Sequence, residues 1–146
     1  MSNLPNDPLL NMSINSFSKK LRQGEINCEQ IVTSYLNRIK ALNDKLNAFI
    51  FIDEKKAINN AIAIDKLLKS GVDLGPLMGL PVAIKDICSV NDMPTTNGSI
   101  VNTDDITGEE GSLVKRLKEL GCVVIGKTHT VEFALGATGL NKHRGT

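Results

Sequence analysis

The chain has 146 residues, and 17 lysines and arginines against 16 aspartates and glutamates leave a net charge of +1. This length suits one domain with its own core, and so balanced a charge argues against binding to nucleic acid or to an anionic membrane. The apolar runs are too short to cross a bilayer. Three scattered cysteines favour reduced thiols and a cytoplasmic location.

The first half of the chain is predicted to be mainly helical. Residues 1–12 are polar, should form a flexible tail, and lack the charged and apolar regions of a secretory signal. Apolar residues then recur at helical spacing in three stretches, of which the second opens on a capping-box pattern at Asn27 and Gln30. The predicted elements are a helix from Ser13 to a stop at Gly24, a helix from Asn27 through Leu42, a short strand or extended run over 46–53, and a helix over 54–70.

The second half changes to a strand–helix–strand pattern. Strands are predicted over 80–84 and 122–125, the second bounded by Gly126, with a polar irregular stretch over 91–105 and a helix over 112–120 between them. This order is typical of a βαβ unit with two parallel strands. Neither strand alternates polar with apolar residues, so both faces should be covered. The fold class is therefore α/β, with a helical N-terminal third packed on a sheet.

Two lysines, Lys85 and Lys127, should lie at the carboxyl ends of the two parallel strands, where open α/β sheets bind ligands. Lys85 has two interpretations: an ammonium that reaches water or pairs with Asp86, or a lysine whose pKa is lowered in a dry site so that it acts as a general base. A lysine base needs a hydroxyl to activate. The nearby loop offers Ser89, Thr95, Thr96 and Ser99, which can equally be turn residues.

The stretch Gly121–Thr128, "GCVVIGKT", matches the phosphate-binding P-loop pattern. A P-loop needs a strand before its first glycine, and here a helix precedes it. The four middle residues are strand formers that disfavour the backbone angles of a phosphate-binding loop. A helix C-cap, a strand and a turn are therefore predicted, and nucleotide binding is the least favoured function.

The histidines give no metal or cofactor site. His129 and Glu132 have helical H-x-x-E spacing, but one histidine and one carboxylate do not form a metal centre, so a capping or surface role is expected. His143 lies in a basic stretch and should be solvated. No cofactor and no metal are predicted.

Three blocks of the sequence together resemble the amidase signature family. They are "GPLMGLPVAIKD" (75–86), "PTTNGS" (94–99) and "LKELGCVVIGKTHTVEFALGATGLNKHRGT" (117–146), and the helical opening is similar too. The resemblance implies an α/β/α amidase fold, with 13–146 as the N-terminal part of one amidase domain, and cleavage of carbon–nitrogen bonds of small amides by a Ser–cis-Ser–Lys triad. It assigns the base to Lys85, a structural role to Lys127, and pocket positions to Ala134 and Gly136.

The family's two serines lie downstream of a "GTPxNPW" landmark, and this chain stops inside that landmark. We therefore expect no nucleophile, no bridging serine and no amidase activity from the 146 residues alone, and self-association through an exposed sheet edge. Within the family, "KDIC" and "EFALGATGL" favour a general amidase over the glutamyl/aspartyl-tRNA amidotransferase, whose family member is the subunit that releases ammonia from glutamine. A non-catalytic remnant or binding module is the alternative from another class.

Overall fold

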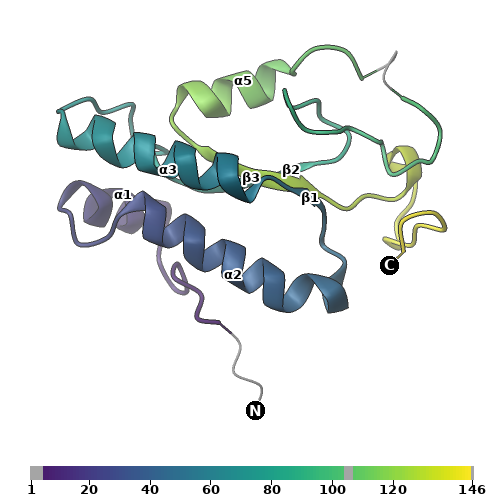
Figure 1. The fold of residues 1–146 in the computed structure, drawn as a ribbon, viewed down its shortest axis with the longest axis horizontal. Helices are drawn as coiled ribbons and strands as arrows, with labels where there is room; N and C mark the ends of the chain where they lie inside the picture. Colours follow the sequence, from purple (N-terminus) through teal and green to yellow (C-terminus); the bar gives the residue numbers. More distant parts are fainter. Residues whose placement is uncertain (1–4, 104–106, 146) are drawn as a thin grey trace.

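The computed structural model describes residues 5–103 and 107–145. Its helices and strands alternate along the chain around a small sheet (Figure 1). The elements are α1 (Ile14–Arg22), α2 (Cys28–Leu46), β1 (Phe49–Ile52), α3 (Glu54–Lys69), β2 (Pro81–Lys85), α5 (Ser112–Glu119), β3 (Val123–Thr128) and the short 3₁₀ helix η1 (Glu132–Ala134).

The described strands form one mixed sheet in the order β1-β3-β2. β2 and β3 run parallel, as predicted, with Pro81 opposite Val123 and Lys85 opposite Thr128. β1 joins the other side of β3 antiparallel. The central strand is therefore β3, and β2 has one edge without a strand partner among the described residues.

The sheet separates two apolar clusters, which makes the fold α/β/α. Side chains of β3 alternate: Val123 and Ile125 enter a cluster with α1, α2 and α3, whereas Val124 enters a second cluster with Val114 of α5. In keeping with this, α2 and α5 lie on opposite sides of the sheet (Figure 1). The predicted α/β class and α/β/α layering are confirmed.

Two predictions about the strands are wrong. β3 does not stop before Gly126 but continues to Thr128, because antiparallel pairing with β1 extends it. β3 is buried on both faces, but β2 is not: most of its residues are partly or fully exposed. The reason is that β2 is an edge strand, and its hydrophobic pattern cannot reveal which strand lies at the centre.

The stretch expected to be a flexible tail contacts α2 from residue 5 onward. The Tyr35 hydroxyl donates to an Asp7 carboxylate oxygen at 2.9 Å, and Arg38 donates to the Pro5 carbonyl. Leu9 and Met12 pack against the larger apolar cluster. No helix in 5–103 or 107–145 is long and apolar enough to span a membrane.

The start of α2 is held by side chains from two places. Asn27, the predicted cap, accepts from the Gln30 amide at 2.8 Å. Asp65 of α3 accepts from the amides of Cys28 and Glu29 at 2.8 and 3.0 Å. A carboxylate at a helix N-terminus meets both free N–H groups and the positive end of the helix dipole. Asp65 therefore ties α3 to the first turn of α2.

We expect Asp65→Ala to lower the free energy of unfolding by about 1–2 kcal/mol, the range found for loss of a helix N-cap. Urea denaturation followed by far-UV circular dichroism measures the change. Asp44→Ala, an exposed position on α2 with no resolved role at a helix end, is the control and should change stability by less than about 0.5 kcal/mol. Equal effects of the two changes would contradict the tie between α2 and α3.

Cys28 makes the fold sensitive to alkaline pH. Its thiol is fully buried and donates to the Gly79 carbonyl at 3.3 Å. Burial, with the nearby Asp65 charge, raises the pKa of Cys28 from 9.0 to about 12. The unfolded chain therefore loses this proton first, and the stability that Cys28 contributes is complete below pH 9 and declines as pH rises toward 12.

Between pH 9 and about pH 10.5, this linkage should remove about 2 kcal/mol of unfolding free energy. Urea titrations across this interval on the wild type and on Cys28→Ala measure it as a difference in slope. The comparison cancels the other groups that titrate here, including Tyr35, whose pKa is raised to about 12 by burial and by the Asp7 hydrogen bond. Parallel pH dependences of the two proteins would contradict the assignment.

Candidate active site at the carboxyl edge of the sheet

Lys85 is the last residue of β2, at the carboxyl edge of the parallel strand pair, as predicted. Its carbonyl accepts from the amides of Ile87 and Cys88 at 2.8 and 3.0 Å. Its side chain is exposed and has no hydrogen bond or ion pair to the described residues. The dry niche predicted around Lys85 is therefore absent from this chain, because β2 is an edge strand and the described residues leave its end open.

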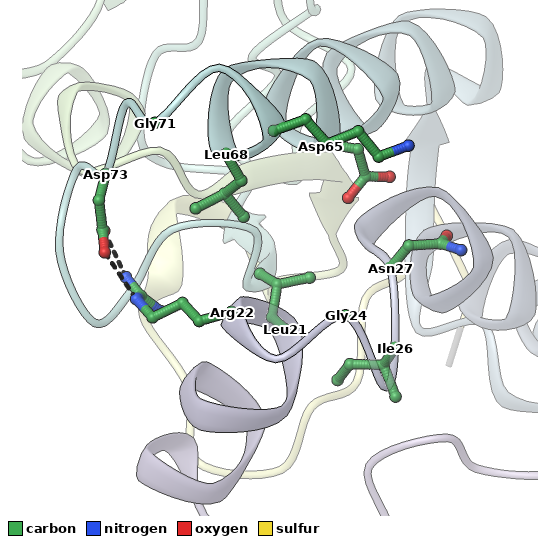
Figure 2. A pocket seen from close by; sticks show the side chains of 10 residues that line it. Leu21, Arg22, Gly24, Ile26, Asn27, Asp65, Leu68, Gly71 and Asp73 are labelled. Atoms are coloured by element: carbon green, nitrogen blue, oxygen red, sulfur yellow. Dashed lines mark hydrogen bonds and ion pairs between the residues drawn. The ribbon is translucent and has the colours of Figure 1, made fainter.

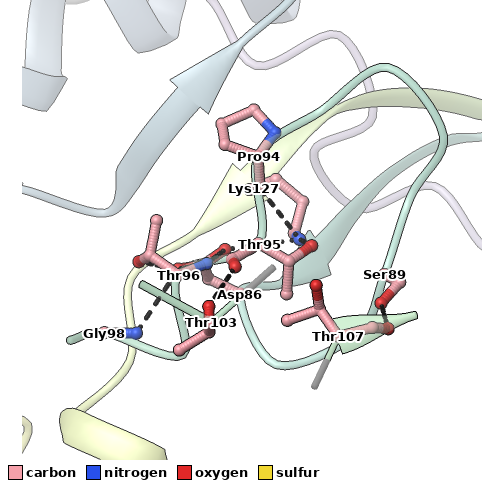
Figure 3. A network of polar contacts seen from close by, with 9 residues as sticks. All are labelled: Asp86, Ser89, Pro94, Thr95, Thr96, Gly98, Thr103, Thr107 and Lys127. Carbon is pink, nitrogen blue, oxygen red and sulfur yellow. Dashed lines mark hydrogen bonds and ion pairs between the residues drawn. The ribbon is translucent and has the colours of Figure 1, made fainter. Parts of the chain in front are cut away.

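The buried lysine at this edge is Lys127 of β3, with 0% of its side chain exposed (Figure 3). Its ammonium lies 3.3 Å from a carboxylate oxygen of Asp86, and it donates to the Thr95 hydroxyl at 2.6 Å and to the Pro94 carbonyl at 3.3 Å. Burial lowers the pKa of Lys127, and the negative charge of Asp86 offsets part of this effect.

Asp86 is the partner of Lys127 rather than of Lys85. Its carboxylate is fully buried and accepts from the amide and hydroxyl of Thr96, at 3.2 and 2.6 Å, and from the Gly98 amide at 3.5 Å. The interpretation in which Asp86 neutralises Lys85 is therefore wrong. The burial of Lys127 was not predicted either, although its position after "VVI" in a β-branched run was a usable signal.

The four hydroxyl side chains considered as partners of Lys85 all bind elsewhere. Each donates to or accepts from a group of the surrounding loops, so none is placed as a nucleophile for Lys85. Ser89 donates to the Thr107 carbonyl, Thr95 accepts from Lys127, Thr96 donates to Asp86, and Ser99 donates to Glu132 at 2.7 Å.

Glu132 of η1 joins the loop after β2 to the C-terminal segment. Besides accepting from Ser99, which is fully buried, its carboxylate lies 3.6 Å from the His143 ring. The carboxylate stands between the serine and the histidine, so the histidine cannot take the serine proton directly. Across 5–103 and 107–145, no three potential ligand side chains gather as a metal site would require.

His129 does not pair with Glu132. Both of its ring nitrogens are buried without a hydrogen-bond partner, and the same is true of the Thr130 hydroxyl. The chain turns here from β3 toward η1, and the His129 amide donates to the Ala48 carbonyl at 2.8 Å. The expected capping or surface role of His129 is wrong, because its ring packs inside this turn.

The two predicted pocket residues lie at or beside one cavity, of about 450 Å³, between η1 and the C-terminal segment. Gly136 lines the cavity, whereas Ala134 is not among its lining residues. Ala134 and Phe133 both have left-handed backbone angles, with φ of 58° and 50°. Two adjacent non-glycine residues in this region indicate a strained turn, of the kind that functional sites often hold.

A second cavity, of about 480 Å³, lies at the other end of the molecule (Figure 2). It is formed by the α1–α2 turn and the end of α3. Its charged side chains already have partners: Arg22 pairs with Asp73 at 2.5 Å, and Asp65 caps α2. This cavity is therefore a cleft between packed helices, without a free reactive group among its charged pairs.

The segment "GCVVIGKT" forms the structure predicted for it rather than a phosphate-binding loop. α5 precedes Gly121, whose φ of 76° suits a helix C-terminus. Val123–Thr128 is strand β3, and its amides are engaged in the sheet. Lys127 is occupied by Asp86, Thr95 and Pro94 and does not point toward a phosphate site.

An α/β/α fold with a lysine at the carboxyl end of a parallel strand defines the class of this protein, a sheet-edge site on a layered α/β scaffold. Comparison with known proteins makes the identity specific. The Amidase family model matches residues 30–146, and the chain belongs to this family.

Individual relatives agree with the family match. A 2-amino-5-chloromuconic acid deaminase of Comamonas testosteroni is 38% identical over 92% of this chain and 29% of its own length. A glutamyl-tRNA(Gln) amidotransferase subunit of Rhodopirellula baltica is 40% identical over 86% of this chain and 25% of its own length. A crystal structure of an amidase superposes with a TM-score of 0.85 at 35% identity, covering 92% of this chain and 30% of the other.

These shares show that the chain spans between a quarter and a third of the length of the proteins it matches. The similarity in fold extends over nearly the whole of this chain, so the arrangement of β2, β3 and η1 is that of an amidase.

Proposed function

We propose that this chain carries the lysine-bearing part of an amidase that hydrolyses carbon–nitrogen bonds of small amides. The observation that carries the proposal is the position of Lys85, at the carboxyl end of parallel strand β2 in a chain of the Amidase family. Lys85 is the proposed base. Gly136 and Ala134 are the proposed pocket residues, supported by the cavity that Gly136 lines.

In the proposed reaction, neutral Lys85 accepts a proton from a bridging serine, which accepts the proton of the nucleophilic serine. The serine oxygen forms a bond to the amide carbon, and the carbon–nitrogen bond breaks as the nitrogen takes up a proton. Water then releases the acyl group as an acid. Both serines come from polypeptide outside these 146 residues, as the resemblance to the family implies.

The exposure of Lys85 in this chain bears on the proposal directly. A solvated ammonium stays charged at neutral pH and cannot act as a base. We therefore infer that the remaining part of an amidase domain has to cover the end of β2 before Lys85 becomes active. The 146-residue chain alone should accordingly release no ammonia from simple amides above the rate without enzyme.

The test uses a protein continued to the length of its relatives, assayed for ammonia release from a panel of simple amides. Lys85→Ala should reduce kcat at least about 100-fold, the lower range for loss of a general base, with the melting temperature unchanged. Lys66→Ala, an exposed lysine on α3, is the matched control and should keep full activity. Equal activity of the two variants would exclude Lys85 as the base.

A second candidate function is that of the ammonia-releasing component of a glutamyl-tRNA(Gln) amidotransferase, supported by 40% identity to a subunit of such an enzyme. In that case the ammonia comes from glutamine, and the release should depend on partner subunits. The same length-extended protein, assayed with glutamine as the only amide, separates the two functions. A protein inactive on every amide and on glutamine would favour a non-catalytic remnant.

Location and association are proposed from composition and exposure. Three free thiols support a cytoplasmic protein. The open edge of β2 and several exposed apolar side chains near η1 support self-association of the isolated chain. The apolar side chains are Ile100, Val101, Phe133, Leu135 and Leu140. Sedimentation velocity at two protein concentrations measures the association.

A further inference from the structure

The loop after β2 returns to the sheet and is fastened there at two points (Figure 3). We call residues 94–98 the return segment. Its carbonyl and hydroxyl groups at Pro94 and Thr95 accept from the Lys127 ammonium. Its amides and hydroxyl at Thr96 and Gly98 donate to the Asp86 carboxylate.

The fastening lies directly beside Lys85. Asp86 follows Lys85 in the chain, its amide donates to the Thr128 carbonyl at 3.1 Å, and its own carbonyl accepts from the Asn97 amide at 3.0 Å. Lys127 lies next to Thr128 on β3, which is the residue paired with Lys85. The ion pair and the return segment therefore hold the backbone on both sides of the point where Lys85 leaves the edge strand.

We propose that the buried Lys127–Asp86 pair, with the return segment bound to it, is a positioning device that fixes the direction in which Lys85 projects from β2. The proposal rests on the role of Lys85 proposed above. Lys127 and Asp86 are positioning residues, because they act on Lys85 through the backbone and through Thr128 rather than on a substrate.

Energetics favour this role over simple stabilisation. Removing two charges from water costs several kcal/mol, so a buried ion pair is often no more stabilising than well-packed apolar residues of similar volume. An apolar pair could fill the same space but could not bind the carbonyl of Pro94, the hydroxyls of Thr95 and Thr96, and the Gly98 amide. These directional bonds set the path of the loop, which packing alone does not.

The test separates position from stability through the double variant Asp86→Leu/Lys127→Met, in which no buried charge is left unpaired. Urea denaturation should show that the double variant recovers most of the stability lost in Lys127→Met alone. Backbone ¹⁵N relaxation should nevertheless show order parameters at residues 85–87 falling from about 0.85 to below about 0.6. The Asn97 amide, whose acceptor is a backbone carbonyl kept in the variant, should also exchange faster with solvent.

The matched control removes another ion pair on the same side of the sheet, with Glu110→Leu/Lys118→Met. Lys118 pairs with Glu110, which is also buried, but neither residue contacts the return segment. Order parameters at residues 85–87 should stay at the wild-type value in this control. A double variant of Asp86 and Lys127 in which residues 85–87 keep wild-type order would overturn the proposal.

The readout involves no turnover, so it is independent of the proposed amidase chemistry. If Lys85→Ala leaves the length-extended protein fully active, the proposed function fails while the order measurement is unaffected. If residues 85–87 keep their order in the double variant, the positioning role fails while the role of Lys85 as a base still stands.

Discussion

Lys127→Met is expected to lower the free energy of unfolding by about 3–5 kcal/mol, which is the range for breaking a buried ion pair from one side. Lys127 and Asp86 are both fully buried, with 3.3 Å between ammonium and carboxylate. Methionine fills much of the space of the lysine stem but leaves the Asp86 charge without its cation. Urea denaturation monitored by circular dichroism near neutral pH measures the loss.

Lys85→Met is the comparison that gives this result its meaning. Lys85 is the other lysine at the carboxyl edge of the parallel strands, but its side chain is exposed and unpaired with the described residues. Its replacement should change the unfolding free energy by no more than about 0.5 kcal/mol. Similar losses for the two variants would mean that Lys127 is not held by a buried charge, and the description of this edge would be wrong.

Gly126→Ala is expected to be the second large effect, with a loss of about 3 kcal/mol or more. A Cβ at position 126 would lie 2.2 Å from the Phe51 carbonyl oxygen and 3.1 Å from the Ile52 Cα. Both are backbone atoms of β1 and cannot move aside as a side chain could. The variant should therefore loosen the β1–β3 pairing, which amide exchange at Phe51 and Asp53 would report.

Gly136→Ala is the control for this substitution. A Cβ at position 136 would meet the Val131 side chain at 3.4 Å, an ordinary van der Waals contact. The stability should be unchanged or slightly higher, because alanine reduces the conformational freedom of the unfolded chain. Thermal melting of both variants gives the comparison, and a Gly126→Ala protein as stable as Gly136→Ala would contradict the close approach of β1.

Local patterns were enough to predict most of the elements. Ser13 caps α1, and its hydroxyl accepts from the Ser16 amide at 3.1 Å. Asn27 caps α2 in the same way through the Gln30 amide. These are interactions between neighbours in the chain, which is why a capping residue followed by apolar residues at helical spacing predicted them.

The errors concern partners distant in the chain. Gly126 was expected to end a strand, because nothing near it indicates that β1 passes close enough to require a glycine. The exposure of Lys85 and the burial of Lys127 exchange the environments expected for the two lysines. Both depend on the edge position of β2 and on a loop that returns over β3, and neither feature is encoded in the residues next to the lysines.

The candidate site was predicted in position but not in state. The family resemblance placed Lys85 at the end of β2, and the structure agrees. The pocket prediction is half supported by geometry, since Gly136 lines a cavity and Ala134 lies beside it in a strained turn. The Asp86–Lys127 pair was missed because a dipeptide "KD" does not say which lysine its aspartate will meet.

The central strand contributes to both apolar layers, and this has a consequence for how the molecule melts. Val123 and Ile125 belong to the cluster under α2 and α3, whereas Val124 belongs to the cluster under α5. Neither layer can come apart without removing the strand on which the other is built. Scanning calorimetry should therefore record a single heat-absorption peak whose van't Hoff and calorimetric enthalpies agree, as for one cooperative unit.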